Sequence, residues 1–514
     1  MQKIKNFKLF NVRPFVFGLA AMIAGVFLAF SFFVSFWFLI GFAIAAIVVV
    51  GVAIRRNWFA FFKSHLTVSI IVLVCFVVGI VSMSLREGVY RKNVAEEGIY
   101  YFAAKAAATT KYEDDLYRTK ISGVTLFDAE TKKQVIKLNE SVYVWTKTSF
   151  EIGDKISFVG YYKAEKHNSI FDVAPQKAYT ISVYSAVNVS GNSKTIFEKY
   201  KTAVWKSLSE NMDESAAGTT FAMLCGDSSK VEQETKENYR AAGVGHILAV
   251  SGLHVGFFVL LLSFLLNLMR VNKKVGFAII FVLLSLFCWL CGFSYSVVRA
   301  SIMSVVLLYA GLRGKQYDGL SALAFATILI LMFDPYQLFT ASFLLSFFSV
   351  FTIFCLNGWL RCGLEKLYPK KFASSLALAI VASIAILPWQ VYFFGYFCTL
   401  GILLNLVAIP LVSVAFMFGF VVAPLASIVP QLGFLLKIPS SVLFIVDGVC
   451  GVTSQIPFSI VSASISPVTI AMWYLAVVLC SDYIFLPRRA KMWTRIGSAA
   501  AALVLFGLNV GGVF

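Results

Sequence analysis

The stretch from Gly243 to Gly256, GVGHILAVSGLHVG, lies where a polar part of the chain enters a long apolar one. It contains two histidines, His246 and His254, and between them the small-residue pair Ser251 and Gly252. A membrane helix can bend or break at a glycine beside a serine, and broken backbone at membrane depth is tolerated only where it is buried in protein or lines a cavity. On a helix, Ser251 and His254 would share one face, and His246 would lie on a neighbouring face. The stretch therefore predicts a break in a membrane helix beside a pore.

The composition of the whole chain is typical of a membrane protein. Of its 514 residues, 59% are hydrophobic and only 14% are charged, and the mean hydropathy is +0.82. Many apolar runs reach the ~20 residues that a helix needs to cross a bilayer. The formal net charge of +18 does not by itself indicate nucleic-acid binding, because lysine and arginine gather at the cytoplasmic ends of membrane helices. All nine cysteines lie in or beside apolar runs, which argues against a disulfide framework.

We expect a polytopic α-helical membrane protein with about 13 spans. No charge occurs from Pro14 to Ile54, which predicts two helices that turn near Ser35, and a third span covers about 66–85. Four of the five loops expected on the cytoplasmic side are basic, whereas the 422–431 connection has no charge. The amino terminus is then cytoplasmic and the carboxyl terminus extracytoplasmic. The ten remaining spans are expected near 247–269, 275–292, 294–312, 319–333, 337–357, 373–393, 399–421, 432–450, 467–486 and 494–511.

Residues 86–195 differ in character and are expected to lie outside the cytoplasm. Apolar and polar residues alternate over short stretches, at 124–127, 135–138, 142–146, 156–162 and 181–189. Alternation over four to eight residues predicts half-buried strands, and five or six such strands indicate a small β barrel.

Aromatic and basic side chains on these strands are candidates for stacking on single-stranded DNA, because single-strand grooves combine positive charge with aromatic platforms. The alternative is that the rings pack in the core or against one another, which is commoner for aromatic residues of strands. The net charge of the region is only +3, which gives DNA binding limited support. The candidates are Tyr143, Trp145, Phe158, Tyr161, Tyr162 and Lys163.

The segment 196–242 predicts amphipathic helix, because apolar residues recur every fourth position from Ile196 to Leu208. Such a helix would lie in the membrane interface or pack on the β region. The chain then divides into four parts: a membrane anchor at 1–85, the β region at 86–195, a helical linker at the membrane surface at 196–242, and a transmembrane bundle at 243–514.

Arg299 lies in the middle of an apolar run, where a charge costs ~2.5 to 3.5 kcal/mol and should face the interior of the bundle. Two roles are open for its guanidinium group. It either binds a phosphate of a nucleic-acid strand or forms an ion pair with Asp447. Gln390 and Asn405 are candidates for interhelical hydrogen bonds or for donors that line a pore.

Prolines divide the last third of the chain. Pro388, Pro410, Pro424 and Pro439 predict either discontinuous helices around a cavity or simple kinks.

The histidines leave three readings open. The commonest role for a histidine at a helix boundary is a satisfied hydrogen bond. A pore or gate is the second reading. A hydrolase with Ser251 as nucleophile and His254 as base is the least favoured, because an orienting acid and an oxyanion hole are not evident.

Several ordered motifs resemble the ComEC-type competence family, and the likeness covers roughly residues 215–425. The family is held to pass single-stranded DNA through the bacterial inner membrane during natural transformation. The resemblance implies that the β region is of the oligonucleotide-binding type and that a pore or gate uses residues of the bundle, namely His246, Ser251, Gly252, His254, Arg299, Gln390 and Asn405. The motifs are GVGHILAVSGLHVG itself, Leu224-Cys-Gly-Asp-Ser228, Gly292 to Met303, Leu320 to Ala324 with Asp334-Pro335 and Ser342 to Phe347, and Leu387-Pro-Trp-Gln390 with Asn405 to Pro410.

We do not expect an enzyme or a cofactor. The chain has no Gly-rich loop for ATP, and its four histidines do not form the metal motifs of the metallo-β-lactamase-like domain that many ComEC-type proteins carry. The expected partners are single-stranded DNA, membrane lipid, a cytoplasmic helicase or single-strand-binding protein, an extracytoplasmic DNA-binding receptor and a separate nuclease. The alternative function is transport of a small molecule or ion, with the β region as a structural cap.

Overall fold

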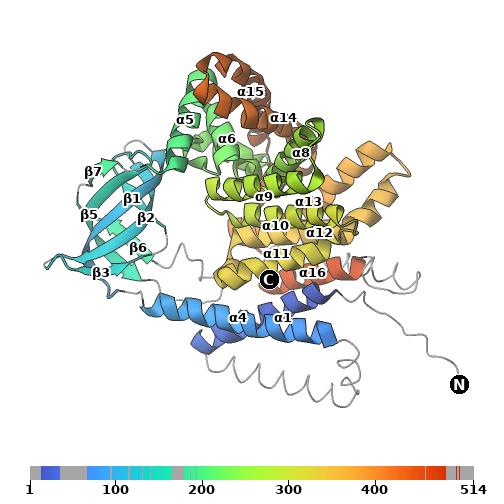
Figure 1. Cartoon of the computed structure of the whole chain (residues 1–514), viewed down its shortest axis with the longest axis horizontal. Coiled ribbons are helices and arrows are strands. Elements are labelled where there is room, and N and C mark those ends of the chain that lie inside the picture. Colours follow the sequence, from blue (N-terminus) through green and yellow to red (C-terminus); the bar gives the residue numbers. More distant parts are fainter. Residues whose placement is uncertain are drawn as a thin grey trace.

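The computed structural model describes residues 13–34, 66–92, 95–113, 116–129, 131–138, 141–164, 179–185, 187–192, 194–457 and 459–481, together with residues 494, 497 and 507. A β sheet lies at one end of a layered helical unit (Figure 1). The expected span after Ser35 and the expected span at 494–511 fall outside the described residues.

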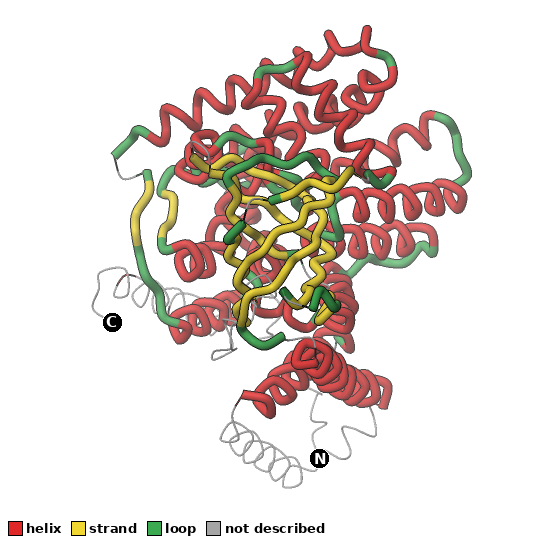
Figure 2. The backbone as a smooth tube through the Cα atoms, turned by 90° about the vertical axis from the view of Figure 1, so that its left-hand side faces the viewer, coloured by secondary structure: helices red, strands yellow, loops and turns green. Residues whose placement is uncertain are grey.

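Seven strands form one antiparallel sheet in the order β3-β2-β1-β5-β6, with β4 paired to β2 and β7 paired to β5. The sheet curls, so that β4 and β6 contact each other without pairing, and Figure 2 shows the crossed strands in front of the helices. The strands are β1 (Gly98–Glu113), β2 (Leu116–Asp128), β3 (Gln134–Lys137), β4 (Val142–Thr146), β5 (Asp154–Ala164), β6 (Tyr179–Val183) and β7 (Asn188–Asn192).

Two of the predicted DNA-stacking residues are in the core of this sheet. Phe158 is 1% exposed and stacks on Phe102 with ring centroids 5.1 Å apart, and Tyr162 is fully buried. Both side chains point inward because they occupy alternate positions of β5, on the face that packs against the sheet core. Their proposed contact with DNA is therefore wrong.

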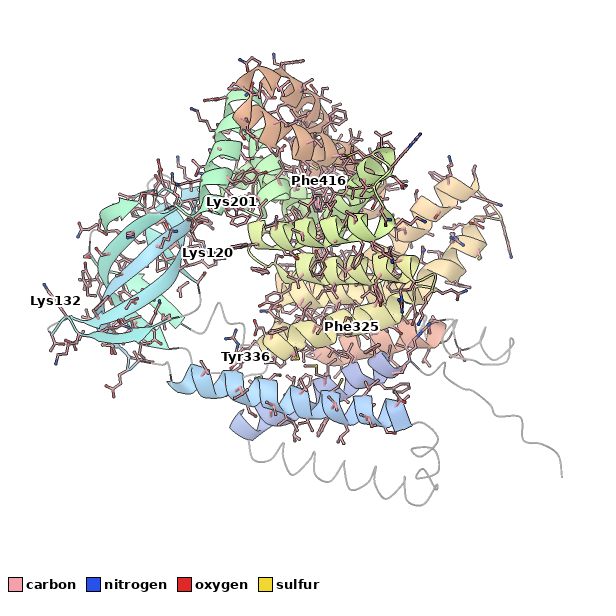
Figure 3. The ribbon with its side chains drawn as sticks, viewed as in Figure 1. Lys120, Lys132, Lys201, Phe325, Tyr336 and Phe416 are labelled. Carbon is pink, nitrogen blue, oxygen red and sulfur yellow. The ribbon has the colours of Figure 1, made fainter. Side chains whose placement is uncertain are left out.

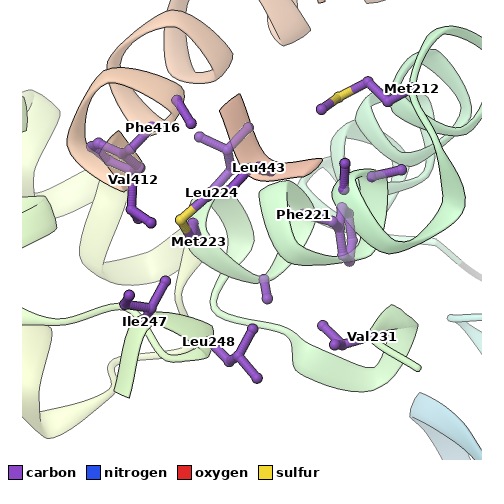
Figure 4. Packing of buried hydrophobic residues seen from close by; sticks show 14 of the residues in the cluster. Met212, Phe221, Met223, Leu224, Val231, Ile247, Leu248, Val412, Phe416 and Leu443 are labelled. Carbon is purple, nitrogen blue, oxygen red and sulfur yellow. The ribbon is translucent and has the colours of Figure 1, made fainter. Parts of the chain in front are cut away.

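The segment 196–242 is helical, as predicted, and contains three α-helices. They are α5 (Ile196–Asn211), α6 (Glu214–Cys225) and α7 (Gln233–Ala241). Ten of the twelve residues of α6 are buried, and Figure 4 shows Met223 and Leu224 beside Val412, Phe416 and Leu443 of later helices. The expected position at the membrane surface is wrong for α6, because small residues such as Ala216 and Gly218 let it enter the core.

The remaining helices match the predicted spans to within a few residues at most boundaries. Seven helical segments of the described chain are long and apolar enough to cross a membrane, by length and composition: 67–89, 273–290, 295–312, 341–364, 370–394, 401–428 and 430–454. The elements are α1 (Pro14–Val34), α4 (Leu66–Lys92), α8 (Gly252–Leu268), α9 (Lys273–Leu290), α10 (Tyr295–Leu312), α11 (Gly319–Phe333), α12 (Ala341–Leu364), α13 (Lys370–Phe394), α14 (Gly401–Ile428), α15 (Lys437–Ser454) and α16 (Pro467–Cys480), with a two-stranded sheet of β8 (Tyr396–Cys398) and β9 (Ile460–Ser462).

Two helices of the anchor cross at a pair of glycines. A Cβ atom at Gly25 of α1 would lie 2.3 Å from the carbonyl oxygen of Phe76, and one at Gly79 of α4 would lie 2.4 Å from that of Met22. Only glycine allows the backbones to approach this closely, as is common where membrane helices pack.

The prolines of the last third do not interrupt their helices. Pro388 lies inside α13, and Pro410 and Pro424 lie inside α14. Of the two alternatives, discontinuous helices are contradicted at these three positions, where the helices continue through the prolines.

Candidate functional site

The stretch 243–256 breaks the chain between α7 and α8, as its glycines predict. Gly243 adopts a φ of 73°, and a Cβ atom there would lie 2.9 Å from the Cα atom of Gly401. A short 3₁₀ turn, Gly245–Leu248, follows, and α8 begins at Gly252. The break at Ser251 and Gly252 is confirmed, whereas the helical relation expected between His246 and His254 is not formed.

Ser251 and His254 are in contact at the start of α8. The backbone N–H of Ser251 donates to Nδ1 of His254 over 3.0 Å, and the Ser251 hydroxyl oxygen lies 3.1 Å from the same nitrogen. Because Nδ1 accepts a hydrogen bond, the neutral ring carries its proton on Nε2. This contact agrees with their spacing at i and i+3, and it caps the helix and fixes the imidazole tautomer.

The proton on Nε2 of His254 points into the protein. The side chain is 2% exposed, and Nε2 has no hydrogen-bond partner among the described residues. The ring meets that of Phe416 on α14 edge to face, with centroids 4.7 Å apart. A buried donor without an acceptor destabilises the folded state. Packing alone therefore does not explain a histidine at this position. His246 differs, because its side chain is exposed.

Arg299 of α10 packs against the start of α8, where the break ends. A Cβ atom at Gly252 would lie 3.5 Å from Cβ of Ala300 and 3.9 Å from Nη2 of Arg299, so the guanidinium group sits against the first turn of α8. The side chain is 4% exposed, and its Nε and Nη1 atoms have no hydrogen-bond partner in the described part of the chain. Arg299 is therefore a buried cation whose donors are largely unused.

The ion pair predicted between Arg299 and Asp447 is not formed. Asp447 of α15 accepts hydrogen bonds from the hydroxyl groups of Tyr239, over 2.6 Å, and Ser215, over 2.8 Å. Ser215 also lies 3.0 Å from the hydroxyl oxygen of Thr235. These donors come from α6 and α7, which were expected on the membrane surface, so their contact with Asp447 could not be predicted from local spacing.

Gln390 and Asn405 lie near the contact between Gly243 and Gly401. The Gln390 amide nitrogen is 3.9 Å from Sγ of Cys398, and the thiol of Cys398 donates to the carbonyl oxygen of Arg240 over 3.0 Å. Asn405 lies one turn into α14, and its Oδ1 has no partner among the residues that the structure describes. Both are thus polar residues close to the break. Among the described residues, neither forms the interhelical hydrogen bond that was one of its two expected roles.

The arrangement at the break favours a negatively charged group. The donors His254 Nε2 and two nitrogens of Arg299 are buried without acceptors, and they lie beside the amino-terminal turn of α8, where the helix dipole is positive. Hydrolysis has less support, because Nδ1 of His254 is occupied by the Ser251 backbone and no carboxylate of the described residues orients Nε2.

The other predicted stacking residues lie on the outer face of the sheet. Tyr143 and Trp145 occupy alternate positions of β4, and Trp145 is 47% exposed. Tyr161 is half-buried on β5, with its ring 6.5 Å from that of Tyr184, and Lys163 is exposed on the same strand. Sequence reasoning missed Arg118, whose guanidinium carbon lies 4.2 Å from the centre of the Tyr143 ring. Alternation along β2 was the signal that could have found it.

Comparison with known proteins points to one family. The family model described as "Competence protein" matches residues 223–491, slightly more than half of the chain. Among curated proteins, the chain is similar to ComE operon protein 3 of Bacillus subtilis (strain 168), with 29% identity over 195 residues, 38% of this chain and 24% of that protein. Recombination protein 2 of Haemophilus influenzae is 24% identical over 251 residues, 45% of this chain and 31% of that protein.

A protein of Escherichia coli (strain K12) named uncharacterized protein YcaI is 25% identical over 197 residues, 37% of this chain and 26% of that protein. The matched part of the chain thus spans about a quarter to a third of the length of these relatives. No solved structure matches the chain.

Proposed function

Because this chain belongs to the competence protein family, we propose that it conducts single-stranded DNA across the bacterial cytoplasmic membrane. The β sheet would lie outside the cytoplasm and receive or support the strand. The break at 243–256 would line or gate the path, with Arg299 and His254 as donors to the phosphodiester backbone.

One observation supports this proposal above the others: His254 and Arg299 both pack at the start of α8, and each has a buried donor without an acceptor among the described residues. A phosphate oxygen accepts hydrogen bonds from arginine and imidazole N–H groups, and the guanidinium fork matches its geometry. The empty donors of Arg299 and His254 would be satisfied whenever a phosphate passes, and left unsatisfied between passages.

The arrangement of the helices is compatible with passage from the sheet inward. The connection between α12 and α13 projects on the right in Figure 1, away from the sheet on the left, and Arg361 and Lys370 lie in the two helix ends that it joins. Positive loops favour the cytoplasmic side, so the sheet would lie on the extracytoplasmic side.

In this proposal, other proteins supply the energy for transport and remove the DNA strand that is not imported. A cytoplasmic helicase or single-strand-binding protein would draw the strand inward. An extracytoplasmic receptor would deliver the DNA, and a separate nuclease would remove the strand that is not imported.

The same donors also favour a second candidate, a transporter of a small anion. A phosphate or carboxylate of a small solute would satisfy Arg299 and His254 equally well. The two candidates differ in the size of the cargo, and this difference is measurable.

The experiment compares entry of labelled DNA into the cytoplasm of cells that carry the wild-type gene, a deletion, His254→Ala or Arg299→Ala, with the membrane level of each variant measured. We expect the deletion to stop DNA outside the cytoplasm, and both variants to be present but defective. Unchanged DNA entry in the deletion would reject the proposal. Uptake of small anions that depends on Arg299 would then identify the transporter.

A further inference from the structure

Positive side chains face one another where the β sheet meets α5 and α7. Lys120 projects from the outer face of β2, Lys201 lies on α5, and Figure 3 shows both at the boundary between the sheet and the helices. Partial burial lowers the pKa of Lys120, the charge of Lys201 lowers it further, and Asp227 acts in the opposite direction. These two lysines therefore feel each other's charge, although they come from parts of the chain about 80 residues apart.

Lys236 of α7 shares one charged neighbour with Lys120, the carboxylate of Asp227. Its pKa is lowered by burial and by the neighbouring Arg240, and it is also raised by Asp227. Asp227 is thus the carboxylate that acts on both Lys120 and Lys236. It already accepts a hydrogen bond from the backbone N–H of Ser229 over 3.0 Å. We call Lys120, Lys201 and Lys236 the basic junction.

Aromatic rings flank the basic junction on both sides. On the sheet, Tyr143 is the partner of Lys120 across β2 and β4, Arg118 lies over its ring at 4.2 Å, and Trp145 is exposed beside them. On the helical side, the ammonium group of Lys230 lies 5.5 Å from the centre of the Trp205 ring. Positive charge interleaved with accessible rings is the composition of surfaces that bind single-stranded nucleic acid.

An ion pair joins the sheet to α5 beside the basic junction. Lys105 of β1 donates to the carboxylate of Glu198 on α5 over 2.6 Å, and Glu198 also accepts from the backbone and the side chain of Thr195. Near the same end of α5, the ring of Phe197 lies 4.4 Å from that of Trp289 on α9. The sheet is therefore fixed to the helical unit beside the lysines, which stay close together despite their repulsion.

We propose that the basic junction binds the phosphodiester backbone of single-stranded DNA, with Lys120, Lys201 and Lys236 on the phosphates and Tyr143 and Trp145 on the bases. A polyanion would relieve the repulsion between Lys120 and Lys201, and it would place the strand between the sheet and the helices that lead to the break. This inference rests on the proposed function, since it assigns where the strand first meets the helical unit.

The test measures binding of a fluorescent 20-nucleotide oligothymidylate to the purified full chain in nanodiscs of zwitterionic lipid, by anisotropy over a range of salt concentrations. The variant is Lys120→Glu with Lys201→Glu. The matched control is Lys132→Glu with Lys133→Glu, which makes the same charge change on an exposed turn at the far tip of the sheet (Figure 3).

We expect the variant at the basic junction to bind at least about 10-fold more weakly than the wild type. Its slope of log affinity against log salt should fall by about 1.4, because each phosphate contact to a single strand contributes ~0.7. The control should stay within about 3-fold of the wild type. Lys120→Gln with Lys201→Gln should bind with intermediate affinity, and its melting temperature shows whether the fold is retained.

Equal binding by the wild type and the variant would overturn the inference, and so would an equal loss in the variant and the control, which would indicate a general charge effect. Loss of binding to vesicles that contain anionic lipid, without loss of oligonucleotide binding, would assign the lysines to the membrane instead. Failure of the proposed function is a separate result, because it is read from DNA entry in the deletion strain and not from this binding measurement.

Discussion

The hydroxyl group of Tyr239 on α7 lies 2.6 Å from Oδ1 of Asp447 on α15 and joins residues 208 positions apart in the chain. This bond, with that from Ser215, satisfies a carboxylate within an apolar helix. It also anchors the segment just before the break at 243–256, because α7 ends at Ala241. The position of the break therefore depends on a polar contact with the last third of the chain.

Replacing Tyr239 by phenylalanine should destabilise this anchor. The change keeps the ring but leaves the Asp447 carboxylate with one donor fewer, and a hydrogen bond to a charged group is worth about 1.5 to 3 kcal/mol. We expect the free energy of unfolding to fall by that amount, measured by thermal or denaturant unfolding in detergent. Tyr200→Phe is the control, since Tyr200 packs beside the same core. Equal stability of the wild type and Tyr239→Phe would contradict the anchoring role.

Attachment of the sheet to α5 should weaken in acid. Burial alone would raise the pKa of Glu198, but hydrogen bonds from Lys105 and Thr195 outweigh it and hold the pKa below its ordinary value. A depressed carboxyl pKa adds stability above the unfolded value of about 4.3, and this stability is lost as the pH falls through the folded pKa.

Hydrogen exchange of the β1 amides between pH 7 and pH 3, corrected for the intrinsic pH dependence of exchange, measures this effect. We expect the protection near Lys105 to fall below about pH 4 in the wild type. In Glu198→Gln it should already be low at pH 7 and should change little with pH. A pH response in Glu198→Gln as large as that of the wild type would refute the assignment.

The sequence predicted the helices of the bundle well because most of them are long apolar runs bounded by polar or small residues. The boundaries of α10 and α11 differ from the prediction by no more than one residue. The contact of Ser251 with His254 was also predictable, because it depends on residues three apart. Such features are local, and local spacing is what a sequence displays.

Long-range packing accounts for the errors. The strand β1 was missed because GIYYFAAKAAATTKYE is rich in alanine, which has low strand propensity, and its strand state depends on pairing with β2 and β5. Asp447 was assigned to Arg299 because both are charges in apolar runs, whereas the fold brings Tyr239 and Ser215 to it instead.

Glycine at 243 should be required for the break. Gly243→Ala would place a side chain at a φ of 73° and 2.9 Å from the Cα atom of Gly401, so both the backbone and the packing would be strained. We expect a loss of at least about 1 to 2 kcal/mol in the free energy of unfolding. Gly256→Ala is the control in the same stretch, because no atom lies within 4 Å of its added Cβ. It should be neutral or stabilising by up to about 1 kcal/mol.

The size of the residue at 252 should control DNA entry. Gly252→Ala adds a methyl group at ordinary contact distances from Ala300 and Arg299, and we expect it to keep uptake near the wild-type level. Gly252→Leu extends the side chain toward the guanidinium group and should reduce uptake at least about 10-fold, since a change of ~1.4 kcal/mol in a barrier has this effect. Entry of labelled DNA, normalised to the amount of protein in the membrane, tests the pair. Equal uptake by Gly252→Leu and Gly252→Ala would place the path elsewhere.

Arg299 offers the sharpest test, because its two possible roles predict opposite changes in stability. If Arg299 serves to bind a passing phosphate, it destabilises the folded protein, because Nε and Nη1 have no acceptor in the described part of the chain. Replacing it by methionine, which keeps much of the volume, should raise the free energy of unfolding by about 1 to 3 kcal/mol and abolish DNA entry.

A structural role predicts the reverse for stability. If Arg299 holds the fold through a bond to a carboxylate, Arg299→Met should destabilise the protein by about 3 to 5 kcal/mol, because the partner would be left buried and unpaired. Arg313→Met, at the exposed end of the same helix, should change the stability by no more than about 0.5 kcal/mol. Unfolding measurements on the three proteins in one detergent, beside DNA entry in cells, therefore separate a residue that serves passage from one that serves the fold.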